Sequence, residues 1–363
     1  MSVTTITCVE VSSLDLALTE PFAIAKGAPA MAANVLVRVE LADGTVGIGE
    51  AAPFTAVSGE TQQGSLLAIE SAKAWLIGRD ARAYRPLATQ LAQSFPEEPA
   101  ARCAVETAVL DALTRHLRMP LWTFFGGAGT ELSTDMTLTA GTTASAAQTA
   151  RAIVARGITT LKVKVGALSP EEDAERLRAV HEAAPGATLL ADANGGYTPA
   201  QAMSLLAALE RMKIPLRLFE QPVDPRDWLD FARMAGPSPV MICADESART
   251  ASDVLRLLHA DALQAVNIKP MKSGVLEAIA IWHVARAAGI EFMIGGMLES
   301  ILAMSFSAHL AAGLGAFSYV DLDTPMFMRD HPFVGGFEQR GPRLSIAHVQ
   351  AGHGVSVRYL VLS

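Results

Sequence analysis

The chain is poor in cysteine and has no segment typical of a secretory signal. Cys8, Cys103 and Cys243 are widely separated in a sequence of 363 residues. A disulfide framework is therefore not expected, and we expect the protein to reside in a reducing compartment. The first residues, MSVTTITCVEV, lack a basic segment followed by an apolar one. We therefore predict a cytoplasmic protein.

Charged residues are also scarce, and the net charge is negative, which does not favour binding to nucleic acid. Charged residues make up 18% of the chain, the net charge is −8 and the isoelectric point is near 5.5. Because no cluster of Lys or Arg offsets this balance, we predict no nucleic-acid partner. Residues 300–320 carry no full charge, but they contain Ser305, His309 and Gly313. We expect a buried helix and strand there, and no membrane partner.

From residue 132 onward, strand-like runs alternate with helical ones, which is typical of a parallel sheet. The Ser169-Pro170 and Thr198-Pro199 pairs each place a capping hydroxyl before a proline at the first helical position. Seven helices fit between the strands, and eight strands are the number that closes a barrel. The eight predicted strands lie near residues 132–139, 159–165, 188–193, 216–221, 240–246, 265–269, 291–296 and 318–322.

The beginning and end of the chain have a different character. Asp43-Gly44 interrupts an alternating run and predicts a hairpin, and helical segments follow over residues 65–78 and 99–117. We therefore predict an α+β capping domain over residues 1–125. A barrel catalytic domain is predicted over 126–329, and the segment 330–363 is predicted to join the capping domain.

Five ionisable residues end successive apolar runs in the barrel region. They are separated by 28, 28, 25 and 24 positions, so each βα unit of about 25 residues supplies one. Active sites of such barrels lie at the carboxyl ends of the strands, so these side chains are expected to converge. The five are Lys164, Asp192, Glu220, Asp245 and Lys269.

The three carboxylates, Asp192, Glu220 and Asp245, are expected to bind Mg²⁺, one ion per subunit. Hard oxygen ligands suit this ion, whereas His or Cys would indicate zinc. The alternative is that each carboxylate caps the following helix. Three carboxylates at successive strand ends favour the metal site.

Lysines stand on both sides of the carboxylate trio. Lys162 and Lys164 are two positions apart, so their side chains point to one face of the strand. Repulsion between the two ammonium groups, together with a nearby divalent cation, would lower the pKa values of both lysines and favour a proton-accepting amine. The alternative is that both are surface lysines. Lys164 and Lys269, facing each other across a metal, can remove a proton from one face of a carbon and return it to the other. That is the arrangement of a racemase or epimerase acting on a carboxylate through an enediolate, and Lys162 adds positive charge.

The runs KVKVG, ADANGGYT, FEQPV, ADES, NIKPMKSG and GGMLES resemble the muconate-lactonizing branch of the enolase superfamily. The resemblance covers nearly the whole chain. It implies a (β/α)₇β TIM-type barrel, of class α/β, with an α+β capping domain. It also implies that the three carboxylates bind Mg²⁺ and that Lys164 and Lys269 are the acid and base. Asn194 and Glu246 would be supporting residues, and Met297 in GGMLES would contact the substrate.

Two aspartates at the eighth strand, Asp321 and Asp323, point to one face. Such a pair is costly without a cation, and a substrate ammonium would supply one, although an Asp-rich turn before Pro325 is the simpler alternative. The pair resembles that of dipeptide epimerases, where it holds the α-ammonium of a dipeptide whose C-terminal residue is inverted. An N-acylamino acid (N-succinylamino acid) racemase or an o-succinylbenzoate synthase is the alternative, because neither needs the pair.

The side chain of the substrate is expected to meet the loops near residues 20–30 and 50–60. Lys26 is the only Lys or Arg in them and could meet an acidic side chain, as in an L-Ala-D/L-Glu epimerase, or could be solvent-exposed. The apolar loop residues would equally suit a hydrophobic side chain. We also expect a homo-oligomer.

Overall fold

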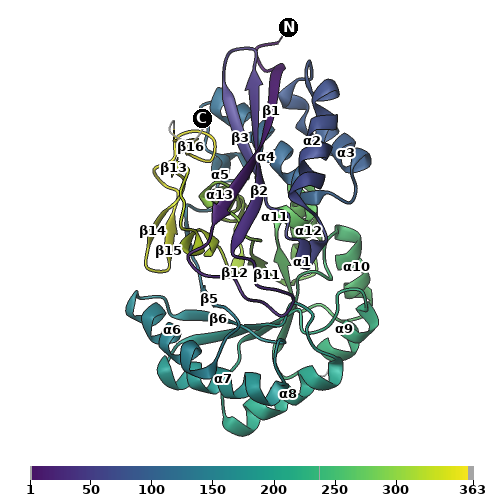
Figure 1. Cartoon of the computed structure of the whole chain (residues 1–363). Helices are drawn as coiled ribbons and strands as arrows, with labels where there is room; N and C mark the ends of the chain where they lie inside the picture. The colour runs from purple at the N-terminus through teal and green to yellow at the C-terminus, as the bar shows by residue number, and fades with distance from the viewer. Residues whose placement is uncertain (1, 237, 359–363) are drawn as a thin grey trace.

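An eight-stranded curled sheet carries an antiparallel sheet above it (Figure 1). The computed structural model describes residues 2–236 and 238–358. Within them, the long strands β1–β3 and the helices α2–α4 stand over one end of the curled sheet, and helices α6–α10 wrap its outside. This arrangement confirms the predicted fold class, a TIM-type barrel with an α+β cap. The boundaries proposed above for the domains stay a prediction.

The N-terminal part is an antiparallel sheet of order β1-β2-β3 packed on helices. The predicted hairpin is present: β2 and β3 pair antiparallel, and Gly44 between them has a φ of +83°, which favours glycine. A third helix, over residues 84–94, was not predicted. The elements are β1 (Ile6–Ala17), β2 (Met31–Leu41), β3 (Val46–Ala51), α1 (Thr55–Ser58), α2 (Gln62–Leu76), η1 (Ala81–Ala83), α3 (Tyr84–Ser94), α4 (Pro99–His116) and α5 (Leu121–Phe124).

The barrel strands follow one another in chain order and pair in parallel. They are β5 (Met136–Leu138), β6 (Thr160–Lys164), β7 (Thr188–Asp192), β8 (Leu218–Glu220), β9 (Met241–Ala244), β10 (Ala265–Ile268), β11 (Glu291–Ile294) and β12 (Phe317–Val320). Their helices are α6 (Thr143–Ala155), α7 (Pro170–Ala183), α8 (Pro199–Met212), α9 (Trp228–Ala235), α10 (Ala251–His259), α11 (Pro270–Ser273), α12 (Val275–Ala287) and α13 (Ile301–Leu314). The predicted caps at Ser169 and Thr198 are confirmed, each within a capping box.

Alternation along the strands produces two layers of side chains inside the barrel. The lower layer is a separate hydrophobic cluster that includes Leu190, Leu218, Cys243, Ala265, Met293 and Tyr319. The residues two positions further along the same strands are polar: Asp192, Glu220, Asp245, Asn267, Gly295 and Asp321, with glycine as the single exception. A side chain two positions on points the same way, so the polar residues form the next layer up.

The first predicted strand, over residues 132–139, is divided in two, which corrects that prediction. Residues on its N-terminal side form β4 (Glu131–Ser133), which pairs with β15 near the C-terminus and not with the barrel. The chain then turns into β5, where Asp135 N donates to Val320 O (2.8 Å) and links the first and last barrel strands. The segment predicted as a single strand thus contributes one strand to each of two sheets.

The C-terminal segment returns to the N-terminal part. Its elements are η2 (Thr324–Phe327), β13 (Phe333–Gly335), β14 (Glu338–Arg340), β15 (Arg343–Ser345) and β16 (Val355–Val357). Asp111 on α4 accepts from His353 N (3.1 Å), and Arg115 donates to Val355 O (2.6 Å). Residues 300–320 form α13 and β12, as expected. Among the described residues, no helix is both long and apolar enough to cross a bilayer.

Carboxylates of the N-terminal part cap helices of the barrel. Glu106 on α4 accepts from Leu276 N at the start of α12 (3.0 Å). Glu50 on β3 accepts from Ser300 N (3.0 Å) and Ala303 N (3.2 Å) at the start of α13. These contacts satisfy N–H groups that a helix leaves unpaired at its beginning, and they tie the two parts together.

Glu106 should make stability depend on pH. Burial raises the pKa of Glu106 from 4.5 to about 7, so the unfolded chain loses this proton first as the pH rises. The free energy of unfolding should therefore decrease as the pH rises from 4.5 to about 7. Glu106→Gln keeps the acceptor without the charge, and we expect it to remove roughly 1–3 kcal/mol of that fall. Urea unfolding at pH 5 and pH 8 checks this; the exposed Glu97→Gln should leave the fall unchanged, and an unchanged fall in the Glu106 variant would contradict it.

Candidate active site

The five residues of the sequence pattern meet at one end of the barrel. Lys164, Asp192 and Glu220 are the last residues of β6, β7 and β8, and they lie side by side in the sheet register. Asp245 and Lys269 directly follow β9 and β10. The three carboxylates are completely buried, and both lysines are more than nine-tenths buried. The convergence predicted from spacing is confirmed as geometry, while the roles of the residues stay proposals.

Each lysine at this end of the barrel is paired with a carboxylate. Lys164 Nζ lies 2.6 Å from Asp192 Oδ2, and Lys269 Nζ lies 2.6 Å from Asp245 Oδ2. Lys162, expected to point to the same face as Lys164, does so and is 1% exposed. Its Nζ contacts Asp321 (2.6 Å), Glu220 (2.7 Å) and Asp192 (3.1 Å). Lys162 therefore joins the carboxylate trio to the aspartates of the eighth strand.

Burial and charge pull the pKa values of the trio apart. Burial, and then repulsion from Asp192, raises the pKa of Glu220 to about 7. Burial alone would raise the pKa of Asp245, but Lys269 and Lys272 bring it well below its usual value. Burial alone would lower the pKa of Lys269, but the negative charges around it, those of Asp245 and Glu220 first, together raise it. The lowered lysine pKa values expected beside a divalent cation depend on that cation's charge and stay a prediction.

Asn194 and Glu246, predicted to be supporting residues, lie beside the lysines and carboxylates, and that role stays a prediction. Asn194 lies two positions after the end of β7, with a φ of +43°, and its Oδ1 accepts from Lys164 Nζ (3.1 Å). Its Nδ2 donates to Glu246 Oε1 (3.2 Å). Asn194 thus links one of the lysines to the loop after β9, and both Asn194 and Glu246 are buried.

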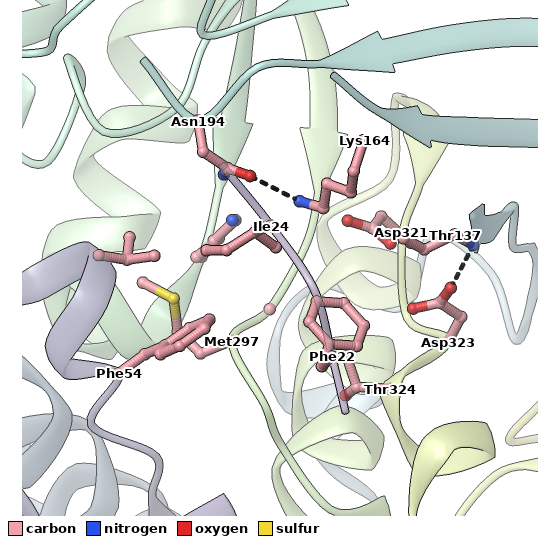
Figure 2. Close-up of a pocket in the computed structure, with 13 residues that line it drawn as sticks. Phe22, Ile24, Phe54, Thr137, Lys164, Asn194, Met297, Asp321, Asp323 and Thr324 are labelled. Carbon is pink, nitrogen blue, oxygen red and sulfur yellow. Dashed lines mark hydrogen bonds between the residues drawn. The ribbon is translucent and has the colours of Figure 1, made fainter. Parts of the chain in front are cut away.

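A cavity lies between the barrel and the loops of the N-terminal part (Figure 2). Apolar side chains form one wall: Phe22, Ile24, Phe54, Val57 and Met297. The other wall is polar and includes Lys164, Lys269, Asn194, Asp321 and Asp323. Met297, predicted to contact the substrate, therefore faces the same space as both lysines.

Lys26 lies in an adjoining chamber and does not line this cavity. The chamber shares Val57 and Met297 with the cavity and is also lined by Asp224 and Arg226. Lys26 is exposed. Of the residues predicted to bind the substrate, Lys26 and the buried Lys162 do not line the cavity, whereas Met297, Asp321 and Asp323 do.

Three buried residues of the site were missed from the sequence. Lys272 donates to Asp245 Oδ1 (2.7 Å), Asp245 O (2.5 Å) and Asn267 O (2.7 Å), and Asn267 donates to Glu220 Oε1 (2.6 Å). Lys272 stands three positions after Lys269 in NIKPMKSG, a helical spacing that could have indicated it. Asn267 lies two positions before Lys269 and so on the same face of the strand. The third, Asp135, gives no signal in the sequence beyond its place in a predicted strand.

Comparisons with known proteins cover the whole fold. Residues 144–360 match the family model "Enolase C-terminal domain-like", and residues 6–126 match "Mandelate racemase / muconate lactonizing enzyme, N-terminal domain". An aromatic dipeptide epimerase of Herpetosiphon aurantiacus is 53% identical over 98% of this chain and 99% of its own. An L-Ala-D/L-Glu epimerase of Thermotoga maritima is 37% identical over 90% of this chain and 94% of its own.

A solved structure extends this similarity. The dipeptide epimerase of Enterococcus faecalis V583, in complex with Mg and the dipeptide L-Leu-L-Tyr, aligns with a TM-score of 0.93 at 33% identity. The alignment covers 97% of this chain and 99% of that one.

Lys272 should be essential for the stability of this arrangement. Lys272→Met leaves Asp245 with Lys269 as its single ammonium partner, and it removes the ammonium donor to the carbonyl groups of Asp245 and Asn267. We expect the free energy of unfolding to fall by about 3 kcal/mol, the usual effect of breaking a buried ion pair. Urea denaturation measures this, with the exposed Lys213→Met as the control. A loss no larger than that of the control would show that Lys272 does not stabilise Asp245.

Proposed function

Because the chain belongs to the mandelate racemase / muconate lactonizing enzyme family of the enolase superfamily, we propose that it is a dipeptide epimerase that inverts the α-carbon of the C-terminal residue. One observation carries the proposal: two buried lysines, Lys164 and Lys269, share a cavity with the carboxylate pair of Asp321 and Asp323. The lysines supply two proton carriers, and the aspartates supply a site for a free amine. The names of the relatives reported above support the same activity.

The donor set fits a magnesium ion. Asp192, Glu220 and Asp245 offer only oxygen atoms, which Mg²⁺ prefers, and all three are completely buried. Glu220 Oε2 has no hydrogen-bond partner among the described residues, although Lys162 Nζ lies 2.7 Å away. These three residues would hold the ion, and the ion would supply positive charge that stabilises the deprotonated substrate. It would also compete with Lys164 and Lys269 for Asp192 and Asp245.

The lysines would carry the proton. In our proposal the neutral amine of one lysine accepts the α-proton, and the ammonium of the other donates a proton to the opposite face of the same carbon. Asn194, which accepts from Lys164 Nζ, would keep that side chain directed at the cavity. Lys162, buried among three carboxylates, would add fixed positive charge and would not transfer a proton.

The apolar wall favours an apolar or aromatic side chain on the C-terminal residue of the substrate. Phe22, Ile24, Phe54 and Met297 offer contact area and no charge. A glutamate side chain, as in L-Ala-D/L-Glu, is the second candidate, because Lys26 in the adjoining chamber supplies a cation. The substrate of an N-succinylamino acid racemase has no free ammonium to offer Asp321 and Asp323, so the dipeptide activity is the one that we propose first.

Isotope exchange tests the proposed activity. The protein is incubated with Mg²⁺ and a library of L,L-dipeptides in D₂O, and we expect deuterium at the α-carbon of the C-terminal residue together with inversion. Lys164→Ala and Lys269→Ala should each lower epimerisation by at least about a hundredfold, because each removes one proton carrier. Exchange without inversion should persist for one enantiomer. Turnover of N-succinylamino acids without any turnover of dipeptides would establish the racemase instead.

Lys26 separates the two side-chain classes. Lys26→Ala should leave kcat/KM for dipeptides ending in Phe or Leu unchanged and should lower it about tenfold for L-Ala-L-Glu, the effect of losing one charged hydrogen bond. Arg226→Ala, in the same chamber but paired with Asp224, is the control. An equal loss on both substrates in the Lys26 variant would contradict a role in side-chain selection.

A further inference from the structure

Asp135 is a buried carboxylate to which the proposed mechanism gives no role. It is 2% exposed, and neither of its oxygens has a hydrogen-bond partner among the described residues. A buried polar group without a partner is costly, and a buried carboxylate more so. A side chain of this kind indicates a ligand site unless the fold alone requires it.

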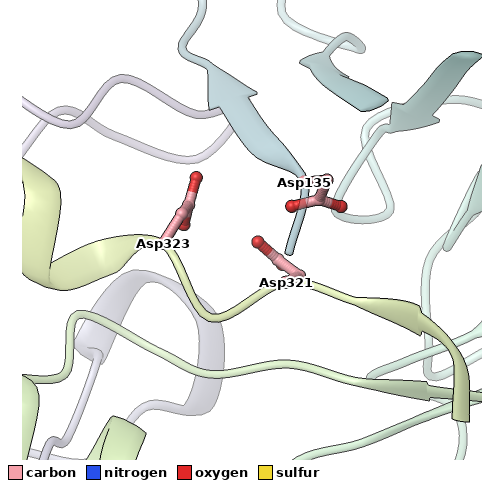
Figure 3. Close-up of side chains that lie close together, drawn as sticks. All are labelled: Asp135, Asp321 and Asp323. Carbon is pink, nitrogen blue, oxygen red and sulfur yellow. The ribbon is translucent and has the colours of Figure 1, made fainter. Parts of the chain in front are cut away.

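Two further carboxylates surround the same space. Asp135, Asp321 and Asp323 each direct an oxygen to within 4.8 Å of the others, and Figure 3 shows the three side chains turned toward one another. They come from the start of β5 and the segment after β12, which the Asp135 N to Val320 O bond holds together. The cluster is thus formed where the first barrel strand meets the last.

Some carboxylate oxygens of the cluster have hydrogen-bond partners, and others have none. Asp321 Oδ2 accepts from Lys162 Nζ (2.6 Å), and Asp323 Oδ2 accepts from Thr137 N (2.6 Å). Among the described residues, Asp323 Oδ1 and both oxygens of Asp135 have none. The ammonium of Lys162 faces the three carboxylates of this cluster, and it also forms ion pairs with Asp192 and Glu220.

A primary ammonium matches this arrangement. Its three N–H groups point in tetrahedral directions, so acceptors at about 2.8 Å from the nitrogen stand about 4.6 Å apart. The three carboxylate oxygens lie within 4.8 Å of one another, which is close to that spacing. Asp321 and Asp323 line the substrate cavity, whereas Asp135 stands behind them and faces a second cavity at the opposite end of the barrel, which Thr160 and Thr188 also line.

We propose that Asp135 is a third acceptor for the α-ammonium of the substrate, so that the site selects dipeptides with a primary amine. This inference rests on the proposed function. An ammonium held between Asp321 and Asp323 would direct its third N–H toward Asp135. A secondary amine, as in an N-methylated dipeptide or one that begins with proline, has two N–H groups and leaves Asp135 unpaired.

The test compares two substrates in three proteins. We expect wild-type kcat/KM for L-Ala-L-Phe to exceed that for its N-methyl derivative by at least about tenfold, the effect of one hydrogen bond to a charged group. Asp135→Asn keeps nearly the same volume, and Asp135→Leu keeps the branching at Cγ but is larger and apolar. Both should lower kcat/KM for L-Ala-L-Phe and bring the kcat/KM values of the two substrates closer together. If the N-methyl group is excluded by its size alone, the ratio stays as in wild type and the inference is wrong.

Controls distinguish hydrogen bonding by Asp135 from a change in the second cavity and from metal binding. Thr188→Val alters the second cavity without touching a carboxylate, and it should keep the wild-type ratio. Equal turnover of both substrates by the wild type overturns the inference with no variant needed. A second equivalent of bound Mn²⁺, counted by electron paramagnetic resonance and lost in Asp135→Asn, would assign the cluster to a metal and overturn it. Absence of turnover for every dipeptide overturns the proposed function as well, whereas dipeptide turnover with an unchanged ratio overturns this inference alone.

Discussion

An excess of buried carboxyl groups over buried amino groups is the constraint on which the rest of this structure depends. Eight buried carboxylates lie in or next to the barrel interior, and four buried lysines face them. The carboxylates are Asp135, Asp192, Glu220, Asp245, Glu246, Glu299, Asp321 and Asp323, and the lysines are Lys162, Lys164, Lys269 and Lys272. Carboxylates in a poorly solvated place repel one another and are costly unless cations pair with them. A divalent ion and a substrate ammonium are the two cations that the proposed reaction would bring.

The fold accommodates these carboxyl groups in a polar layer of the barrel interior that is separate from the apolar layer below it. Four of the six inward residues of the lower layer, Leu190 and Leu218 among them, are followed two positions later by a carboxylate, so the barrel has an apolar layer and a polar layer above it. The loops of the N-terminal part then cover the polar layer with Phe22, Ile24 and Phe54. Excluding water strengthens every charge interaction beneath them, which is useful for catalysis and costly for stability.

Much of the fold could be predicted from the sequence because it depends on local patterns. The strand runs, the capping boxes at Ser169 and Thr198, and the turn at Gly44 each express a preference of a few neighbouring residues. The first barrel strand could not be predicted correctly, because β4 separates from β5 only through pairing with a segment more than 200 residues away. The helix over residues 84–94 lacks a capping side chain, which explains why its sequence signal is weak.

The candidate site divides in the same way. The sequence by itself determined which strand ends carry Lys164, Asp192, Glu220, Asp245 and Lys269, since regular βα spacing places one residue per unit at the same end of the barrel. Only the tertiary structure decided that Lys272 reaches Asp245 and that Asp135 lies against Asp321, and it placed Lys26 outside the cavity. These contacts depend on barrel closure and on side-chain reach across strands, and residue spacing along the chain does not show which partner each side chain meets.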